Sequence, residues 1–128
     1  MYDVISGISV GSINSAGIAL YPKGQEEEAT DFIVEIWNNM EAKNLWKYWD
    51  KGWYDAFTNE TGILDSSPLN EFIQSVLGNK SFYRKLIVGA VDLQSGSFIN
   101  IDADDLEMEE RATAILASAS VPGVFPVT

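Results

Sequence analysis

The sequence MYDVISGISVGSINSAGIAL, residues 1–20, carries the pattern from which the fold is predicted. Residues 1–6 predict a short buried strand, which glycines then interrupt. Residues 10–20 are small and tolerate a helix, and proline and glycine follow them as helix-ending residues. The sequence therefore predicts a strand, a tight turn and a helix in immediate succession.

The turn between this strand and helix has the pattern Gly-x-Ser-x-Gly, formed around Ser9 by Gly7 and Gly11. A serine on so sharp a turn needs small neighbours, and we expect a Cβ at either glycine to clash with the turn. The turn would lift Ser9 Oγ towards a crevice beyond the strand end. The Val10 N–H and the positive end of the helix would face the oxyanion of an acyl transfer. This context favours a nucleophile over a structural glycine turn.

Two nucleotide-binding loops fit the same residues poorly. A dinucleotide-binding loop needs Gly-x-Gly-x-x-Gly, but Ile8 and Ser9 occupy the place of its second glycine. A Walker-type phosphate loop needs Gly-Lys-Ser/Thr, and no lysine precedes Lys23. The sequence therefore argues against nucleotide binding.

The rest of the chain alternates between amphipathic helices and strands. Residues 67–77 predict a helix that Ser67 caps, with Pro68 at its first position and Gly78 closing it. The other expected elements are helix 25–40, strand 85–93, turn 94–97, strand 98–102 and helix 106–120. This order predicts a single α/β domain.

Composition excludes several classes of function. The chain has 128 residues, no histidine, no cysteine and a formal charge of −11, so phosphate-rich nucleic acid is an unsuitable partner. The acidic residues 102–110 lack the spacing of a calcium loop and predict a solvated helix entry. No apolar run could span a bilayer and no secretory signal is visible. We expect no metal and no cofactor, and a location in the cytoplasm or at a membrane surface.

The missing histidine limits what could activate Ser9. A serine nucleophile needs a group that takes its proton. That base is therefore either a carboxylate, whose basicity burial can raise, or a group outside this chain.

Four stretches in order give a resemblance to a known family: YDVISGISVGSINSAGIA, GILDSSPLNEFI, GAVDLQSGSFINI and ASASVPGVFPV. They are similar to the nucleophile elbow, the Gly-x-x-Asp-x-Ser-Pro-Leu segment, the Asp-Leu-x-x-Gly hairpin and the Ala-Ser-x-x-x-Pro-x-x-Phe-Pro stretch of the patatin-like phospholipases. The family consists of serine lipid acyl hydrolases with a Ser-Asp dyad. The resemblance covers nearly the whole chain.

The resemblance implies a three-layer α/β/α domain with a mostly parallel central sheet, incomplete at both ends and represented here by residues 1–128. It implies a phospholipase A or acylglycerol lipase that forms an acyl-enzyme on Ser9. The family's oxyanion glycine loop and catalytic aspartate motif would fall before residue 1 and after Thr128. We therefore expect the isolated chain to be inactive. Asp92, in the hairpin motif, is expected to be structural.

Two other functions remain open. One is a non-catalytic lipid-binding or scaffold domain of the same fold. The other is a conventional α/β-hydrolase whose histidine lies further along, which the Ser-Pro-Leu and Pro-Gly-Val-Phe-Pro stretches disfavour.

Residues 43–54 combine lysines with Trp46, Trp49 and Trp53. A flap that buries these rings on the domain is the favoured interpretation. The alternative is peripheral contact with a membrane, because aromatic rings and lysines together are typical of interfacial anchors.

Overall fold

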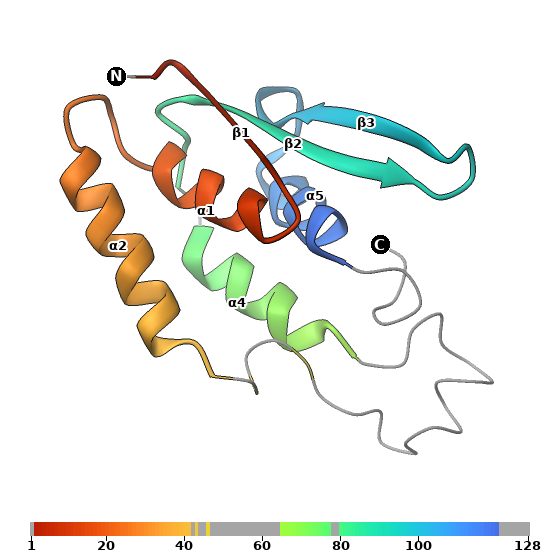
Figure 1. The fold of residues 1–128 in the computed structure, drawn as a ribbon, viewed down its shortest axis with the longest axis horizontal. Helices are drawn as coiled ribbons and strands as arrows, with labels where there is room; N and C mark the ends of the chain where they lie inside the picture. The colour runs from red at the N-terminus through yellow and green to blue at the C-terminus, as the bar shows by residue number, and fades with distance from the viewer. Residues whose placement is uncertain (1, 42, 44–45, 47–64, 78–79, 121–128) are drawn as a thin grey trace.

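The computed structural model describes residues 2–41, 43, 46, 65–77 and 80–120. Along the chain, the elements are β1 (Val4–Ile8), α1 (Val10–Ala19), α2 (Glu26–Asn39), α4 (Ser67–Leu77), β2 (Lys85–Asp92), β3 (Ser97–Asp102), a 3₁₀ turn (Ala103–Asp105) and α5 (Met108–Ala119). The α/β prediction is confirmed, and the arrangement is consistent with part of an α/β/α domain (Figure 1).

The strands form a mixed sheet in the order β1-β2-β3. β1 is parallel to β2, with Ile5 opposite Leu86, and β2 is antiparallel to β3, with Val88 opposite Ile101. The β2–β3 hairpin is therefore confirmed. Gly96 closes its turn at φ 69°, a left-handed conformation that glycine adopts without a Cβ penalty.

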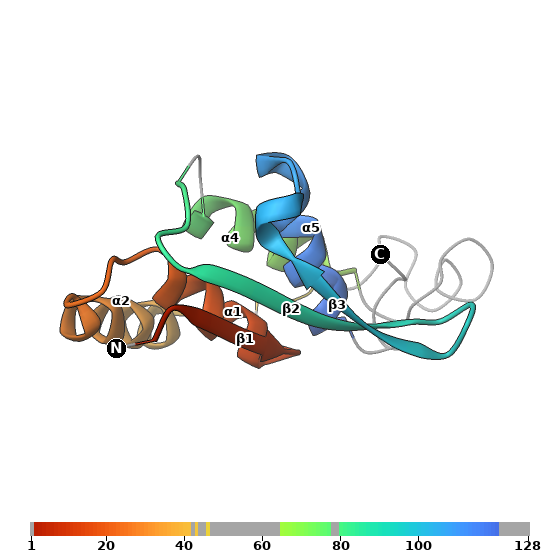
Figure 2. The ribbon, with the colours of Figure 1, turned by 90° about the horizontal axis from the view of Figure 1, so that it is seen from above.

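The core lies between the sheet and the helices on one of its faces. Figure 2 shows α4 and α5 on one side of β2. Leu86 and Val88 point to this side and are almost fully buried against apolar residues of α1, α4 and α5. Because side chains alternate across a strand, only every second residue of β2 contributes to this core.

The opposite face of the sheet is open among the described residues. Val4, Ile8, Val91 and Phe98 lie on it, and each is at least half exposed. The prediction of a buried strand over residues 1–6 is therefore wrong in two respects: β1 spans Val4–Ile8, and it is half exposed. The physical reason is that β1 is an edge strand of this sheet and the helices contact only its other face.

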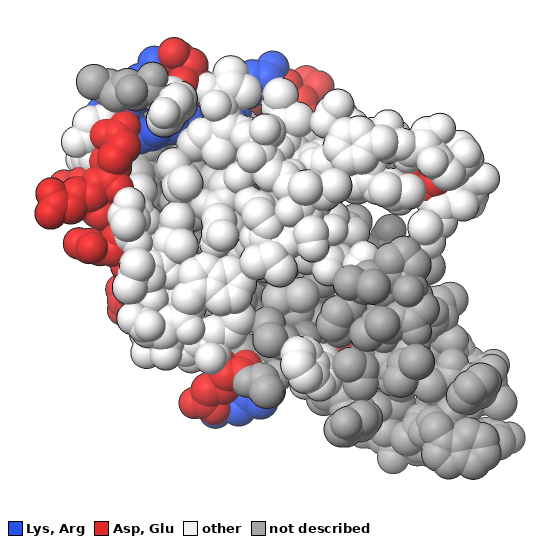
Figure 3. Space-filling model, viewed as in Figure 1, with Lys and Arg blue, Asp and Glu red and all other residues white. Residues whose placement is uncertain are grey.

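α2 packs on the outer side of α1. The predicted amphipathic face is confirmed, since Ala29 and Ile36 are buried. A Cβ at Gly17 would lie 3.0 Å from Ile33 Cγ1, so α2 packs directly on the backbone of α1 at this point. The acidic side chains of α2 gather on its solvent side (Figure 3), where three glutamates in the first turn complement the helix dipole.

The start of α4 differs from the prediction. Ser67 does not cap the helix; instead, its N–H and its Oγ both donate to Oδ1 of Asp65, at 2.8 and 2.5 Å. The Asn70 N–H donates to the Ser66 carbonyl, so the first backbone bond of α4 is accepted by Ser66. Ser67 is therefore already a helical residue, and the Asp65 side chain bonds to it from before the helix. A buried carboxylate is a stronger acceptor than a hydroxyl, and Asp65 is only 5% exposed. The predicted closing residue, Gly78, lies outside the described residues.

An ion pair between Lys85 and Asp102 joins the hairpin strands, with Nζ and Oδ2 2.5 Å apart. The hydrogen bond from Lys85 holds the pKa of Asp102 below its ordinary value of 3.8, and Asp102 raises the pKa of Lys85 above 10.5. The carboxylate's contribution to the free energy of unfolding is therefore present above about pH 3.8, and it is lost as the pH falls through the lowered pKa of Asp102. The contribution of Lys85 to the free energy of unfolding is present below pH 10.5, and it is lost as the pH rises through the raised pKa of Lys85.

We expect Asp102→Asn to reduce the acid sensitivity of the fold. The free energy of unfolding in urea, measured at neutral pH and well below 3.8, should fall less in this variant than in the unsubstituted protein. Asp31→Asn, at an exposed position of α2, is the matched control and should keep the original difference. Equal acid sensitivity in Asp102→Asn and the unsubstituted protein would contradict the assignment.

Candidate active site

Ser9 occupies the single residue between β1 and α1. Its backbone has φ 56° and ψ −135°, and it is the one non-glycine residue with positive φ in the described part of the chain. Such a conformation costs a residue with a Cβ about 1–3 kcal/mol and persists where the surroundings enforce it. Ser9 is exposed, so the strained turn presents its side chain at the surface.

The two glycines of the pattern have different structural roles. A Cβ at Gly7 would overlap the carbonyl oxygen of Gly11 and come within 2.6 Å of its carbonyl carbon, so the expected clash is found there. At Gly11 the expectation is wrong, because a Cβ would meet no described atom within 4 Å. The close contact is between the backbone at Gly7 and the backbone at Gly11, and a Cβ on the helical residue would point away from it.

Two hydroxyls of α1 hold the carbonyls around the turn. Ser12 Oγ donates to the Ser9 carbonyl at 2.6 Å, and Ser15 Oγ donates to the Ser6 carbonyl at 3.0 Å. Both serines are buried, and Ser12 has no exposed surface. The small residues of this helix therefore place hydroxyls against the elbow, a role that the helix-tolerant pattern of residues 10–20 did not predict.

A third hydroxyl at the turn belongs to α5, which is distant from Ser9 in the sequence. The Ser9 N–H donates to Oγ of Ser118, on α5, at 2.9 Å. Ser118 Oγ in turn donates to the Gly89 carbonyl of β2 at 2.6 Å. Sequence reasoning missed this residue, although Ser118 lies in the ASASVPG stretch that carried part of the resemblance.

The Ser9 hydroxyl and the first N–H of α1 make no hydrogen bond to a described residue. Ser9 Oγ makes no hydrogen bond to a described residue, since the bonds of Ser9 involve only its N–H and carbonyl. Val10 is the first residue of α1, so its N–H has no acceptor within the helix. The Ser9 N–H is already occupied by Ser118, whereas the N–H groups of Val10 and Gly11, the first two residues of α1, have no acceptor within the helix.

Other residues singled out in the sequence lie away from this turn. Asp92 accepts hydrogen bonds from the Gln94 N–H and the Ser95 hydroxyl in the hairpin turn, which confirms its structural role. The Ser95 hydroxyl and the Gln94 N–H lower the pKa of Asp92. Trp46 is half-buried, and Trp49 and Trp53 lie outside the described residues.

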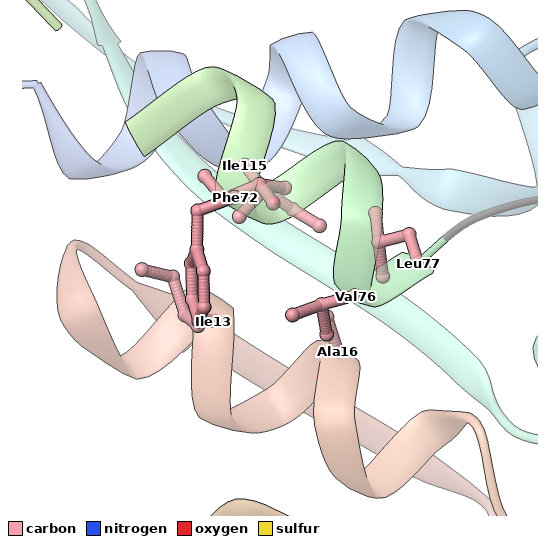
Figure 4. A pocket seen from close by; sticks show the side chains of 7 residues that line it. Ile13, Ala16, Phe72, Val76, Leu77 and Ile115 are labelled. Atoms are coloured by element: carbon pink, nitrogen blue, oxygen red, sulfur yellow. The ribbon is translucent and has the colours of Figure 1, made fainter. Parts of the chain in front are cut away.

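A small apolar cavity lies between α1, α4 and α5. In Figure 4, Phe72 lies beside Ile13, and Val76 beside Ala16. Its volume of about 10 Å³ is near the lower limit for one water molecule. A space of that size does not hold an acyl chain, so we assign this cavity to the packing of the three helices.

In the described part of the chain, no three acidic side chains cluster closely enough to hold a metal ion. None of the described helices is long and apolar enough to cross a membrane.

The model of one family, the patatin-like phospholipases, matches residues 1–128 of the chain. The chain belongs to the patatin-like phospholipase family. The strand, strained serine turn and helix described above therefore lie within a patatin-like domain, and membership indicates a lipid acyl hydrolase. No individual curated protein matches the chain significantly.

Proposed function

We propose that this patatin-like domain hydrolyses carboxylic esters of lipids through an acyl-enzyme formed on Ser9. The observation that carries the proposal is the backbone of Ser9, held at φ 56° with its side chain exposed between a strand and a helix. A strained, non-glycine conformation costs stability, so it is an expected feature of a site that function maintains. The substrates we infer are phospholipids or acylglycerols, as family membership suggests.

In the proposed reaction, Ser9 Oγ attacks the ester carbonyl as its proton passes to the aspartate base that the family resemblance implies. The Val10 N–H and backbone N–H groups of a glycine loop stabilise the tetrahedral oxyanion. Its collapse breaks the bond to the alcohol, which leaves with the proton. Water, deprotonated by the same base, then attacks the acyl-enzyme and releases the fatty acid and free Ser9. No cofactor enters this scheme.

The surface around the turn suits an uncharged ester. Figure 3 shows an area nearly free of charged side chains over β1, α1 and the hairpin, while the acidic side chains gather over α2. Val4 and Ile8 of β1 are half exposed, so apolar side chains contribute to the surface of this strand. Peripheral membrane contact through Trp46, Trp49 and Trp53 remains a further part of the proposal.

Covalent labelling tests the proposal directly. A fluorophosphonate incubated with the full-length protein should modify Ser9, located by peptide mass spectrometry, because the reagent reports an activated serine in an acyl-transfer site. Prior incubation with a lipid ester should slow the labelling. If the protein is folded and Ser9 stays unlabelled, the proposed enzymatic function is contradicted. That result would support the alternative, a lipid-binding or scaffold domain.

A further inference from the structure

Three elements meet at the backbone of the nucleophile turn through one side chain. Ser118 lies on α5, 109 residues along the chain from Ser9. Its hydroxyl accepts the Ser9 N–H at 2.9 Å and donates to the Gly89 carbonyl at 2.6 Å. A hydroxyl has one hydrogen to donate and lone pairs to accept with, so both bonds can be made together.

These two bonds differ from the other contacts that hold the turn. Ser12 and Ser15 belong to α1, which follows Ser9 directly, and their short bonds join this helix to the carbonyls of Ser9 and Ser6. The Ser12 hydroxyl also donates to the Ile115 carbonyl of α5, but over 3.5 Å, the longest of these distances. Ser118 restrains the turn relative to α5 and β2. A residue at φ 56° returns to a commoner conformation unless its surroundings hold it, and the bond from Ser118 acts on the amide adjacent to that torsion.

We propose that Ser118 is a positioning residue for the nucleophile: it fixes the Ser9 amide so that Ser9 Oγ and the Val10 N–H keep the geometry of attack. Ser118 touches neither substrate nor the reacting oxygen in this role. Its hydroxyl also occupies the Ser9 N–H, which leaves the first N–H groups of α1, that of Val10 foremost, as the donors this turn can offer to the oxyanion. The inference rests on the proposed function of Ser9.

The test compares Ser118→Ala with Ser118→Thr, which keeps the hydroxyl, in the full-length protein. Ser120→Ala is the matched control, because the Ser120 hydroxyl donates to the Leu116 carbonyl of its own helix and not to the turn. With a soluble fatty-acyl ester, we expect Ser118→Ala to lower kcat about 10- to 100-fold, the order of loss that a misplaced reacting group produces. KM should stay within about twofold, since substrate contacts are unchanged.

Ser118→Thr should recover most of the lost kcat, and Ser120→Ala should leave kcat unchanged. If Ser118→Ala loses no more kcat than Ser120→Ala, the inference is wrong. It is also wrong if Ser118→Thr loses as much kcat as Ser118→Ala while both melt at lower temperature, because the effect is then one of packing.

Amide hydrogen exchange separates this inference from the proposed function. The exchange of the Ser9 N–H, followed by NMR, should be faster in Ser118→Ala than in Ser120→Ala, whether or not the protein turns over an ester. If Ser9 is not labelled by the fluorophosphonate but its N–H exchanges faster in Ser118→Ala, the proposed enzymatic function is wrong and the restraint of the Ser9 amide by Ser118 is supported. Equal exchange of the Ser9 N–H in the two variants would contradict the restraint by Ser118.

Discussion

Ser9→Ala will reduce ester hydrolysis by the full-length protein by roughly 10⁴- to 10⁶-fold, the loss seen when a serine hydrolase loses its nucleophile. Without Oγ no acyl-enzyme forms, and only slow attack by water on a bound ester remains. The loss should appear in kcat, because the uncharged area around the turn and the Val10 N–H are unchanged. Initial rates with a chromogenic fatty-acyl ester would measure it, and residual Ser9-independent turnover above 1% of the original would contradict the assignment.

The strain at Ser9 supplies an independent control. Alanine has a Cβ and keeps the cost of φ 56°, so Ser9→Ala should unfold at nearly the same urea concentration as the original protein. Ser9→Gly removes that cost and should raise the free energy of unfolding by about 1 kcal/mol, although it is equally inactive. A destabilised Ser9→Gly would show that the turn is not strained, and would remove the observation on which the proposed function depends.

Gly7→Ala will have the largest effect on stability, lowering the free energy of unfolding by about 3–5 kcal/mol. The new Cβ would overlap the backbone of Gly11, which cannot move without displacing α1 from β1. Two of the three nearest atoms are main-chain atoms of Gly11, and the third is the hydroxyl of buried Ser15, so local rearrangement gives little relief. Urea unfolding at neutral pH would measure the change, and activity should fall with it because the Ser9 turn shifts.

Gly11→Ala is the matched control for Gly7→Ala. No described atom lies within 4 Å of its Cβ position, and Gly11 lies in the first turn of α1. Alanine is the better helix former, so this variant should be neutral or more stable by up to about 1 kcal/mol. Similar destabilisation in both variants would contradict the distinction that the structure makes between the two glycines.

Much of this site could be predicted from local sequence. The strand-like run of residues 1–6, the small residues of α1 and the glycine pattern placed Ser9 between a strand and a helix, because those preferences act over a few neighbouring residues. The hairpin, the turn role of Asp92 and the buried face of α2 followed from the same short-range signals. The exposure of β1 was not predicted, because what covers a strand comes from elsewhere in the fold. The start of α4 was also predicted less well, because two local acceptors compete there and the Asp65 carboxylate, two residues earlier, takes the bonds of Ser67.

The sequence by itself determined that a serine stands at a strand-to-helix turn, and that residues 1–128 hold no histidine or cysteine to assist it. Only the tertiary structure decided that Gly7, and not Gly11, must lack a Cβ, and that Ser118 holds the Ser9 amide from α5. The physical reason is that these two kinds of information act over different distances along the sequence. Backbone preferences depend on adjacent residues, whereas steric contact and hydrogen bonding between β1, α1 and α5 exist only after the folded chain has brought them together.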